Sequence, residues 1–320
     1  PNKVWPTVTD PVAISFYGGH IYVLGQGTHA LAKQDAADGR IVQVFAPGAT
    51  NYLKGAFSEP ADLVIDSSSG QAFVSCMGSD SVFQIDLSGS MTEVRRWRTG
   101  LGAFPGEHIT HGGADEYSLG VKRPRFLSLH GGNLYVAPFL SGNNTLTFME
   151  GDSPSGSGHK GTDIINGHAS QDSFGGALAI TGLRNDGMPD ADLICIDLDQ
   201  PASTQISTVI RRAGSMLTAH GFHPTSDEVW MLGMYSKNLD ENTEPDFKGD
   251  FARNTLVVRP LASGAPPVTI DPSSGTIDLD QPGYSESKSL PLPYALEFGG
   301  PNGLTAIASS TLSRISLRDS

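Results

Sequence analysis

One layout of short strands occurs five times along this 320-residue chain and limits the folds that the chain can adopt. The clearest copy starts with an apolar run, Pro60–Asp66, which leads through a turn at Gly70 into a second run, Gln71–Ser75, and then a third, Asp80–Leu87. The runs alternate in polarity or are rich in β-branched and aromatic residues, and Ser, Gly and Asp fill the turns. Each copy therefore predicts three consecutive strands.

The other four copies repeat the first run, the turn and the second run. They are Pro11–Phe16 with His20–Leu24, Pro124–Leu129 with Asn133–Ala137, Leu217–Phe222 with Glu228–Leu232, and Pro293–Phe298 with Leu304–Ala308. Arg40–Phe45 and Thr92–Trp97 are candidate fourth strands. A lone four-stranded sheet cannot bury both of its faces, so such sheets stack around a channel. The layout predicts an all-β fold, a β-propeller of four-stranded blades with five blades recognisable. The alternative is a β-sandwich, although sandwich strands need not repeat one pattern five times.

The copies are spaced more widely than the ~40–45 residues of a typical blade, which indicates long loop insertions. We place these insertions at about 150–189, 236–254 and 263–289. Loops longer than ~15 residues are often functional, so we expect the binding surface among them. Residues 1–320 are predicted to form a single propeller domain, incomplete at its C-terminal end, where Arg314–Leu317 reads as the third strand of a new blade. Either further sequence or another subunit then completes the ring, unless Val4–Val8 supplies a closing strand.

The turn-and-strand pattern resembles that of the YVTN-type bacterial β-propellers, named for a Tyr-Val-Thr-Asn strand. That strand is varied here as Tyr22-Val-Leu, Phe73-Val-Ser and Tyr135-Val-Ala. Residues 135–144, 189–197 and 244–254 resemble an extracytoplasmic group of the family, some members of which continue into a di-haem peroxidase-like cytochrome domain. The resemblance implies seven blades, two more than the five recognised here. The chain has no Cys-x-x-Cys-His motif, so no covalent c-type haem is expected in these residues.

Composition narrows the partners and the compartment. The net charge of -13, from 21 Lys+Arg and 34 Asp+Glu, argues against nucleic acid because nothing would neutralise the phosphates. No apolar run approaches the ~18 residues of a transmembrane segment. The 38 Gly and 21 Pro argue against a helical bundle. A first residue other than Met, low Lys and abundant Ser, Thr, Gly and Asn favour a periplasmic or extracellular location.

Two short segments contain candidate metal ligands. These candidates are His108, His111, Asp186, Asp190 and Asp192. Neutral imidazoles spaced as in His-x-x-His suit a transition metal. Alternating carboxylates suit calcium, although the segment lacks the full twelve-residue loop and its final Glu. An ordinary turn before a strand explains the acidic segment without any metal. A second pair, His220 and His223, is expected to consist of a strand residue and a turn residue.

Nucleophilic catalysis finds no support in the sequence. There is no Gly-x-Ser-x-Gly motif, and neither Cys76 nor Cys195 lies beside a His, so both are expected to be inert thiols. We therefore expect an extracytoplasmic module that binds or scaffolds another protein subunit or a larger assembly. The alternative is an enzyme or redox-complex component, either lactonase-like or associated with a quinoprotein or cytochrome.

Overall fold

The computed structural model describes 17 segments of the chain, and these are antiparallel strands with their turns. The segments are 4–47, 57–79, 81–99, 121, 123–139, 145–146, 163–164, 170–171, 178–179, 191–199, 206–211, 216–236, 252–261, 276–278, 293–299, 304–309 and 314–318. These residues contain no α-helix, only one 3-10 turn, η2 (Met77–Ser79). Accordingly, no helix in the described segments is long and apolar enough to cross a membrane.

Four sheets have four strands each and a fifth has three. The first two consist of β1 (Pro11–Tyr17), β2 (His20–Gly25), β3 (Ala30–Asp35) and β4 (Ile41–Phe45), and of β5 (Pro60–Asp66), β6 (Gln71–Cys76), β7 (Ser81–Asp86) and β8 (Thr92–Arg98). The third and fourth consist of β9 (Pro124–His130), β10 (Asn133–Pro138), β15 (Ala191–Asp197) and β16 (Ile206–Arg211), and of β17 (Met216–Phe222), β18 (Glu228–Ser236), β19 (Ala252–Pro260) and β20 (Thr276–Asp278). The fifth is formed by β21 (Pro293–Gly299), β22 (Leu304–Ser309) and β23 (Arg314–Arg318).

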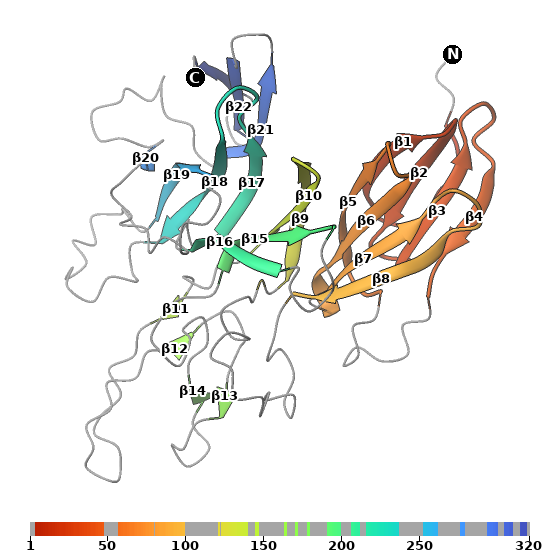
Figure 1. Cartoon of the computed structure of the whole chain (residues 1–320), viewed down its shortest axis with the longest axis horizontal. Helices are drawn as coiled ribbons and strands as arrows, with labels where there is room; N and C mark the ends of the chain where they lie inside the picture. The colour runs from red at the N-terminus through yellow and green to blue at the C-terminus, as the bar shows by residue number, and fades with distance from the viewer. Residues whose placement is uncertain are drawn as a thin grey trace.

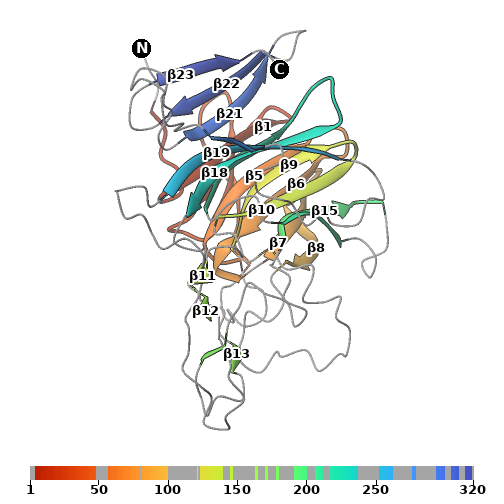
Figure 2. The same ribbon diagram turned by 90° about the vertical axis from the view of Figure 1, so that its left-hand side faces the viewer.

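These five sheets are the blades of a β-propeller. Their first strands, β1, β5, β9, β17 and β21, lie next to one another in that order, and the remaining strands of each sheet extend outward (Figures 1 and 2). The predicted fold class is therefore confirmed, and all five predicted copies are blades. In Figure 1 the first blade lies at the right and the fifth at the upper left, well apart from each other.

The third blade is interrupted between its second and third strands. The chain leaves β10 at Pro138 and returns at Ala191 to form β15, which pairs with β10. Two small pairs lie between them, β11 (Thr145–Leu146) with β12 (Asp163–Ile164) and β13 (Ser170–Gln171) with β14 (Leu178–Ala179). Apart from β12, β13, β14, β20 and the ends of β18 and β19, the predicted insertions lie outside the described residues, so their extent stays a prediction.

A shared irregularity aligns the five blades. Near the start of each first strand, the pairing with the second strand shifts by one residue. When the five first strands are aligned at this bulge, the second-strand residues that pair with the middle of each first strand occupy equivalent positions. They are Tyr22, Phe73, Tyr135, Trp230 and Ala306. The four aromatic members are buried, which makes an aromatic side chain on the second strand the constant feature of blades one to four.

The predicted core positions are confirmed. Phe73, Val74, Tyr135 and Val136 are all buried, in clusters that each span two consecutive blades. The predicted glycine turns are also present, since Gly70 adopts a φ of 70° between β5 and β6, a region that favours glycine.

The N-terminal segment does not form the closing strand that was considered from the sequence. Residues 4–8 have no strand structure. They lie against the first blade, the one that follows them in the chain. The Nε2 group of Gln34 on β3 donates a hydrogen bond of 2.8 Å to the carbonyl oxygen of Pro6. The Trp5 ring lies against Gly39, a position with a φ of 75° where any side chain would collide with the ring.

We expect Leu134→Ala to lower the free energy of unfolding by ~2–5 kcal/mol, because Leu134 is fully buried between the second and third blades. Urea denaturation measures this change. The control is Val94→Ala on β8, where the side chain is 52% exposed and should matter by less than ~0.5 kcal/mol. Equal losses for the two variants would contradict the assignment of Leu134 to an inter-blade core.

Deleting residues 150–189 should leave the blades intact, since the insertion is predicted to be an excursion from one blade. A cooperative thermal transition measured by circular dichroism, close to that of the full chain, is the expected result. Loss of cooperative unfolding would show that the insertion is part of the core.

Candidate functional site

Consecutive blades are joined by the first strand of one blade packing on the second-strand aromatic residue of the preceding blade. The ring centroids of Phe222 and Tyr135 are 4.5 Å apart, and those of Phe298 and Trp230 are 5.3 Å apart. The equivalent residues in the second and third blades are aliphatic and pack into the same kind of cluster. A side chain at this position of the first strand therefore points toward the preceding blade.

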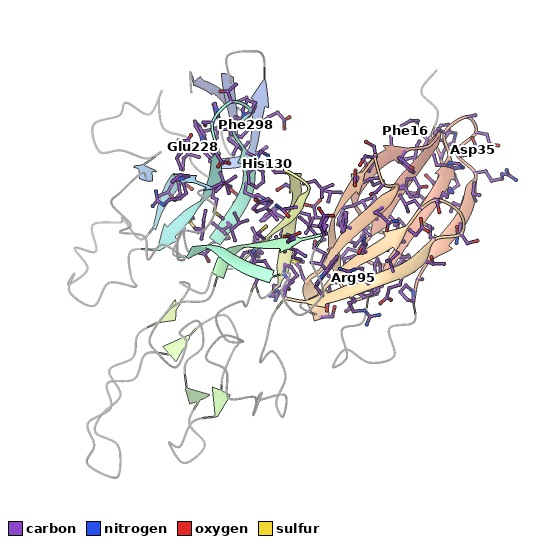
Figure 3. All side chains as sticks on the ribbon, viewed as in Figure 1. Phe16, Asp35, Arg95, His130, Glu228 and Phe298 are labelled. Carbon is purple, nitrogen blue, oxygen red and sulfur yellow. The ribbon has the colours of Figure 1, made fainter. Side chains whose placement is uncertain are left out.

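The first blade presents the same residues with nothing packed on them. Ile14 is 70% exposed, whereas its equivalents Leu63 and Leu127 are 6% exposed. Phe16, the equivalent of Phe222 and Phe298, is 66% exposed. Figure 3 shows Phe16 on the side of the first blade that faces away from the other blades. An apolar surface that is buried in every other blade is thus open to solvent here.

The N-terminal segment covers only the middle of this surface. A row of paired residues, Ile14, Val23, Ala32 and Val44, crosses the face from β1 to β4. Val23 and Ala32 are buried, but Ile14 and Val44 at the two ends of the row are exposed. We call the exposed apolar residues that the strand pairing places on this surface the open face: Ile14, Phe16 and Val44.

The contact between the third and fourth blades contains a partly buried polar pair. Ser128 Oγ on β9 and His220 Nε2 on β17 are hydrogen-bonded at 2.5 Å. His220 occupies the position held by Leu63, Leu127 and Leu296 in other blades, and its Nδ1 has no hydrogen-bond partner among the described residues. Burial lowers the pKa of His220 from 6.5 to about 4, so the imidazole is neutral at pH 7.

Aromatic groups surround this pair. The His130 ring stacks on Phe222 with a centroid distance of 4.4 Å and an interplanar angle of 13°. Tyr135 packs on the same ring, and burial, the largest cause, raises the pKa of its hydroxyl well above the usual value. The site therefore keeps His220 and Tyr135 uncharged. Among the described residues, no third group bonds to His220 Nδ1 to orient it as the base of a nucleophilic serine.

The contact between the second and third blades relies on a carboxylate. Asp62 Oδ2 accepts a hydrogen bond of 2.8 Å from the backbone N–H of Leu127 in the next blade. Burial raises the pKa of Asp62, while this hydrogen bond and one from the N–H of Leu63 act against the rise. Ser75 Oγ also donates to the carbonyl oxygen of Arg125 at 3.1 Å. These contacts fix the register of two blades and form no open site.

His223 belongs to the contact between the fourth and fifth blades. Its Nδ1 accepts a hydrogen bond of 3.0 Å from the backbone N–H of Ser226, and its ring stacks on Trp230. His220 on β17 contacts the third blade, whereas His223, which follows the end of β17, packs on Phe298 of the fifth blade. The expectation that this pair consists of a strand residue and a turn residue agrees with the structure.

Most of the predicted metal ligands lie outside the described residues. Among them are His108, His111, Asp186 and Asp190, while Asp192 is fully buried on β15. No group of three His, Cys, Asp or Glu residues that could hold a metal ion occurs within the described segments. The assignment of calcium or a transition metal to these residues therefore stays a prediction.

Both cysteines are free thiols. Cys76 is buried, and burial raises the pKa of its thiol far above the usual value. A thiol that stays protonated is a poor nucleophile, in agreement with the expected inert Cys76. Cys195 on β15 is only partly buried, so burial does not test the prediction that its thiol is inert.

The sequence predicted an incomplete ring, and so an exposed blade face, but it did not identify Ile14 and Phe16 as part of that face, and it missed the Ser128–His220 pair. A signal for His220 was present, because aligning the copies on the bulge places this His among leucines. The open face had no such signal, since Ile14 and Phe16 look like ordinary core residues.

Comparisons with known proteins give structural likeness only. No family model matches the sequence, and no curated protein matches it. The fold is similar to that of Kuenenia stuttgartiensis hydrazine synthase (14% identity, TM-score 0.45, 99% of this chain and 79% of that one). It is also similar to a candidate 6-phosphogluconolactonase from Bacteroides fragilis (10% identity, TM-score 0.48, 98% of this chain and 66% of that one). A chain of a mitotic checkpoint complex is similar at 11% identity and a TM-score of 0.45, over 96% of this chain and 61% of that one.

We expect His220→Leu to make the protein more resistant to acid. Between the pKa of 6.5 in the unfolded chain and about 4 in the folded one, only the unfolded chain binds a proton at this residue, so stability falls as the pH falls. Urea denaturation from pH 7 to pH 4 should show a difference from wild type that grows by ~1–3 kcal/mol. The control Leu296→Ala changes the position equivalent to His220 in the fifth blade, which does not titrate, and should give a constant difference. A constant difference for His220→Leu would contradict the argument.

Proposed function

We propose that the chain is a module that binds or scaffolds another protein, and that it does so through the open face of the first blade. The observation that carries this proposal is the exposure of Ile14 (70%) and Phe16 (66%), whose equivalents in the other blades pack against a neighbouring blade. Burying one such side chain stabilises a contact by ~1.5–3 kcal/mol. Contiguous exposed apolar residues of this kind mark interaction surfaces.

The partner class follows from chemistry rather than from resemblance to known structures. The open face is uncharged, and the net charge of -13 disfavours nucleic acid as a ligand. A protein surface with apolar groups is the complement that such a face requires.

We infer in addition a periplasmic or extracellular location and a kinship with the YVTN-type propellers. The location is supported by the composition, and the kinship by an aromatic residue followed by a buried apolar one on four second strands. The second-strand pairs are Tyr22-Val23, Phe73-Val74, Tyr135-Val136 and Trp230-Met231.

The alternative is an enzyme or redox-complex component, and the Ser128–His220 pair is the feature that favours it. Elemental analysis and an absorption spectrum of the purified protein separate the two functions. A stoichiometric calcium or transition metal would support the sites predicted at His108, His111, Asp186, Asp190 and Asp192. A transition metal or a haem Soret band would favour the alternative.

Site-specific cross-linking tests the binding function. We expect photo-reactive benzoylphenylalanine at position 16 to cross-link the chain to one predominant protein in the cells that express it. The control carries the same group at position 94, an apolar residue exposed on the second blade. Identical patterns from positions 16 and 94, or no cross-link from position 16, would contradict the proposal.

A further inference from the structure

Strand β9 carries polar contacts to both neighbouring blades at two adjacent residues. The backbone N–H of Leu127 donates to Asp62 Oδ2 of the second blade at 2.8 Å. The hydroxyl of Ser128 is hydrogen-bonded to His220 Nε2 of the fourth blade at 2.5 Å. Asp62 and His220 both titrate, so the third blade has a proton-binding partner on each side. Because these contacts join consecutive blades, they do not depend on how the ring is completed.

The contact around His220 has no acceptor for a second proton on the ring. A neutral imidazole has one N–H donor, whereas the imidazolium has two. Ser128 Oγ can accept from Nε2, but Nδ1 is buried and has no hydrogen-bond partner among the described residues. Protonation of the closed contact therefore leaves a charged N–H buried without an acceptor, which is costly. Opening the contact lets water accept that bond.

No charged group among the described residues compensates for a proton on His220. The strands packed on β17 are β9, β10, β18 and β21, and β17 itself has no other titratable residue. The described titratable side chains of these strands contact other groups or face away. Arg125 lies over the Phe139 ring, His130 and Tyr135 pack on Phe222, Glu228 accepts from Ser226 and Trp230, and Glu297 faces away from β17. Burial alone accordingly lowers the pKa of His220.

Asp62 responds to acid in the opposite sense. Burial raises its pKa even though the N–H groups of Leu127 and Leu63 bond to the carboxylate, so the folded chain binds this proton more readily than the unfolded chain. The contact between the second and third blades is therefore not weakened as the pH falls. A protonated carboxyl also keeps acceptor capacity for the Leu127 N–H.

We propose that protonation of His220 opens the contact between the third and fourth blades while the contact between the second and third blades stays closed. Mild acid then causes a local, reversible opening on one side of β9 and exposes the packed rings of Tyr135 and Phe222. The fold does not require a titrating residue at this position, because the equivalent residue is a leucine in the second, third and fifth blades. This inference does not rest on the proposed binding function.

Hydrogen exchange at two backbone amides reports the two contacts separately. The Leu217 N–H donates to the carbonyl oxygen of Phe139 at 3.0 Å across the third and fourth blades, and the Leu127 N–H donates to Asp62. NMR measurements at pH 7 and pH 5 are corrected for the intrinsic exchange rate. We expect the opening constant at Leu217 to rise ~20-fold at pH 5, because His220 regains its pKa of 6.5 when the contact opens. The opening constant at Leu127 should stay the same or fall.

Two variants remove the titrating group, and a third is the matched control. His220→Leu introduces the residue of the other blades, and His220→Gln keeps an amide that can bond to Ser128. Both should abolish the pH response at Leu217, and near-ultraviolet circular dichroism checks that each is folded. The control His130→Gln removes another histidine of the same contact and should keep the response.

Three outcomes would overturn the proposal. A response that survives in a folded His220 variant would exclude His220 as the switch. Loss of the response in His130→Gln would assign the proton to His130. Equal opening at Leu127 and Leu217 would show global unfolding instead of a local opening.

Discussion

The architecture depends on one contact, in which a second-strand aromatic residue of one blade packs on the first strand of the next. A four-stranded sheet has two faces and no core of its own, so each blade gains its stability from its neighbours. Tyr22, Phe73, Tyr135 and Trp230 supply this contact at four successive positions. A blade face without such a neighbour exposes to solvent the apolar residues that form the core in the other blades.

Polar groups enter these contacts only where they are paired or held neutral. Asp62 in the second blade is bonded to a backbone N–H of the third. His220 replaces a leucine, bonds to Ser128 and remains neutral because burial lowers its pKa to about 4. These two groups specify which blade follows which at a cost in hydrophobic burial. Because its pKa is lowered, His220 also makes the contact between the third and fourth blades sensitive to acid.

The strands could be predicted from the sequence because the signal is local: an apolar run, a glycine turn and a second run recur with the same spacing. The aromatic-Val pairs on the second strands carried the same information about burial. The predicted incomplete ring implied an exposed blade face, but which side chains form it could not be predicted, because the exposure of Ile14 depends on whether another sheet lies beside β1, which no local pattern encodes. The Ser128–His220 pair joins residues 92 positions apart and depends on the register of two blades.

The two ends of the stack of blades differ in kind, and this difference limits what can associate with them. The first blade presents large apolar residues that accept an aromatic group, and the fifth presents Ala306 beside the exposed carboxylate of Glu297. If the two surfaces were complementary, copies of the chain would join head to tail, and such contacts produce open filaments when they do not close into a ring. The charge of Glu297 opposes that outcome, while Ile14 and Phe16 remain available to a sheet of different sequence. The charge of Glu297 therefore makes the fifth blade a poor neighbour for the open face.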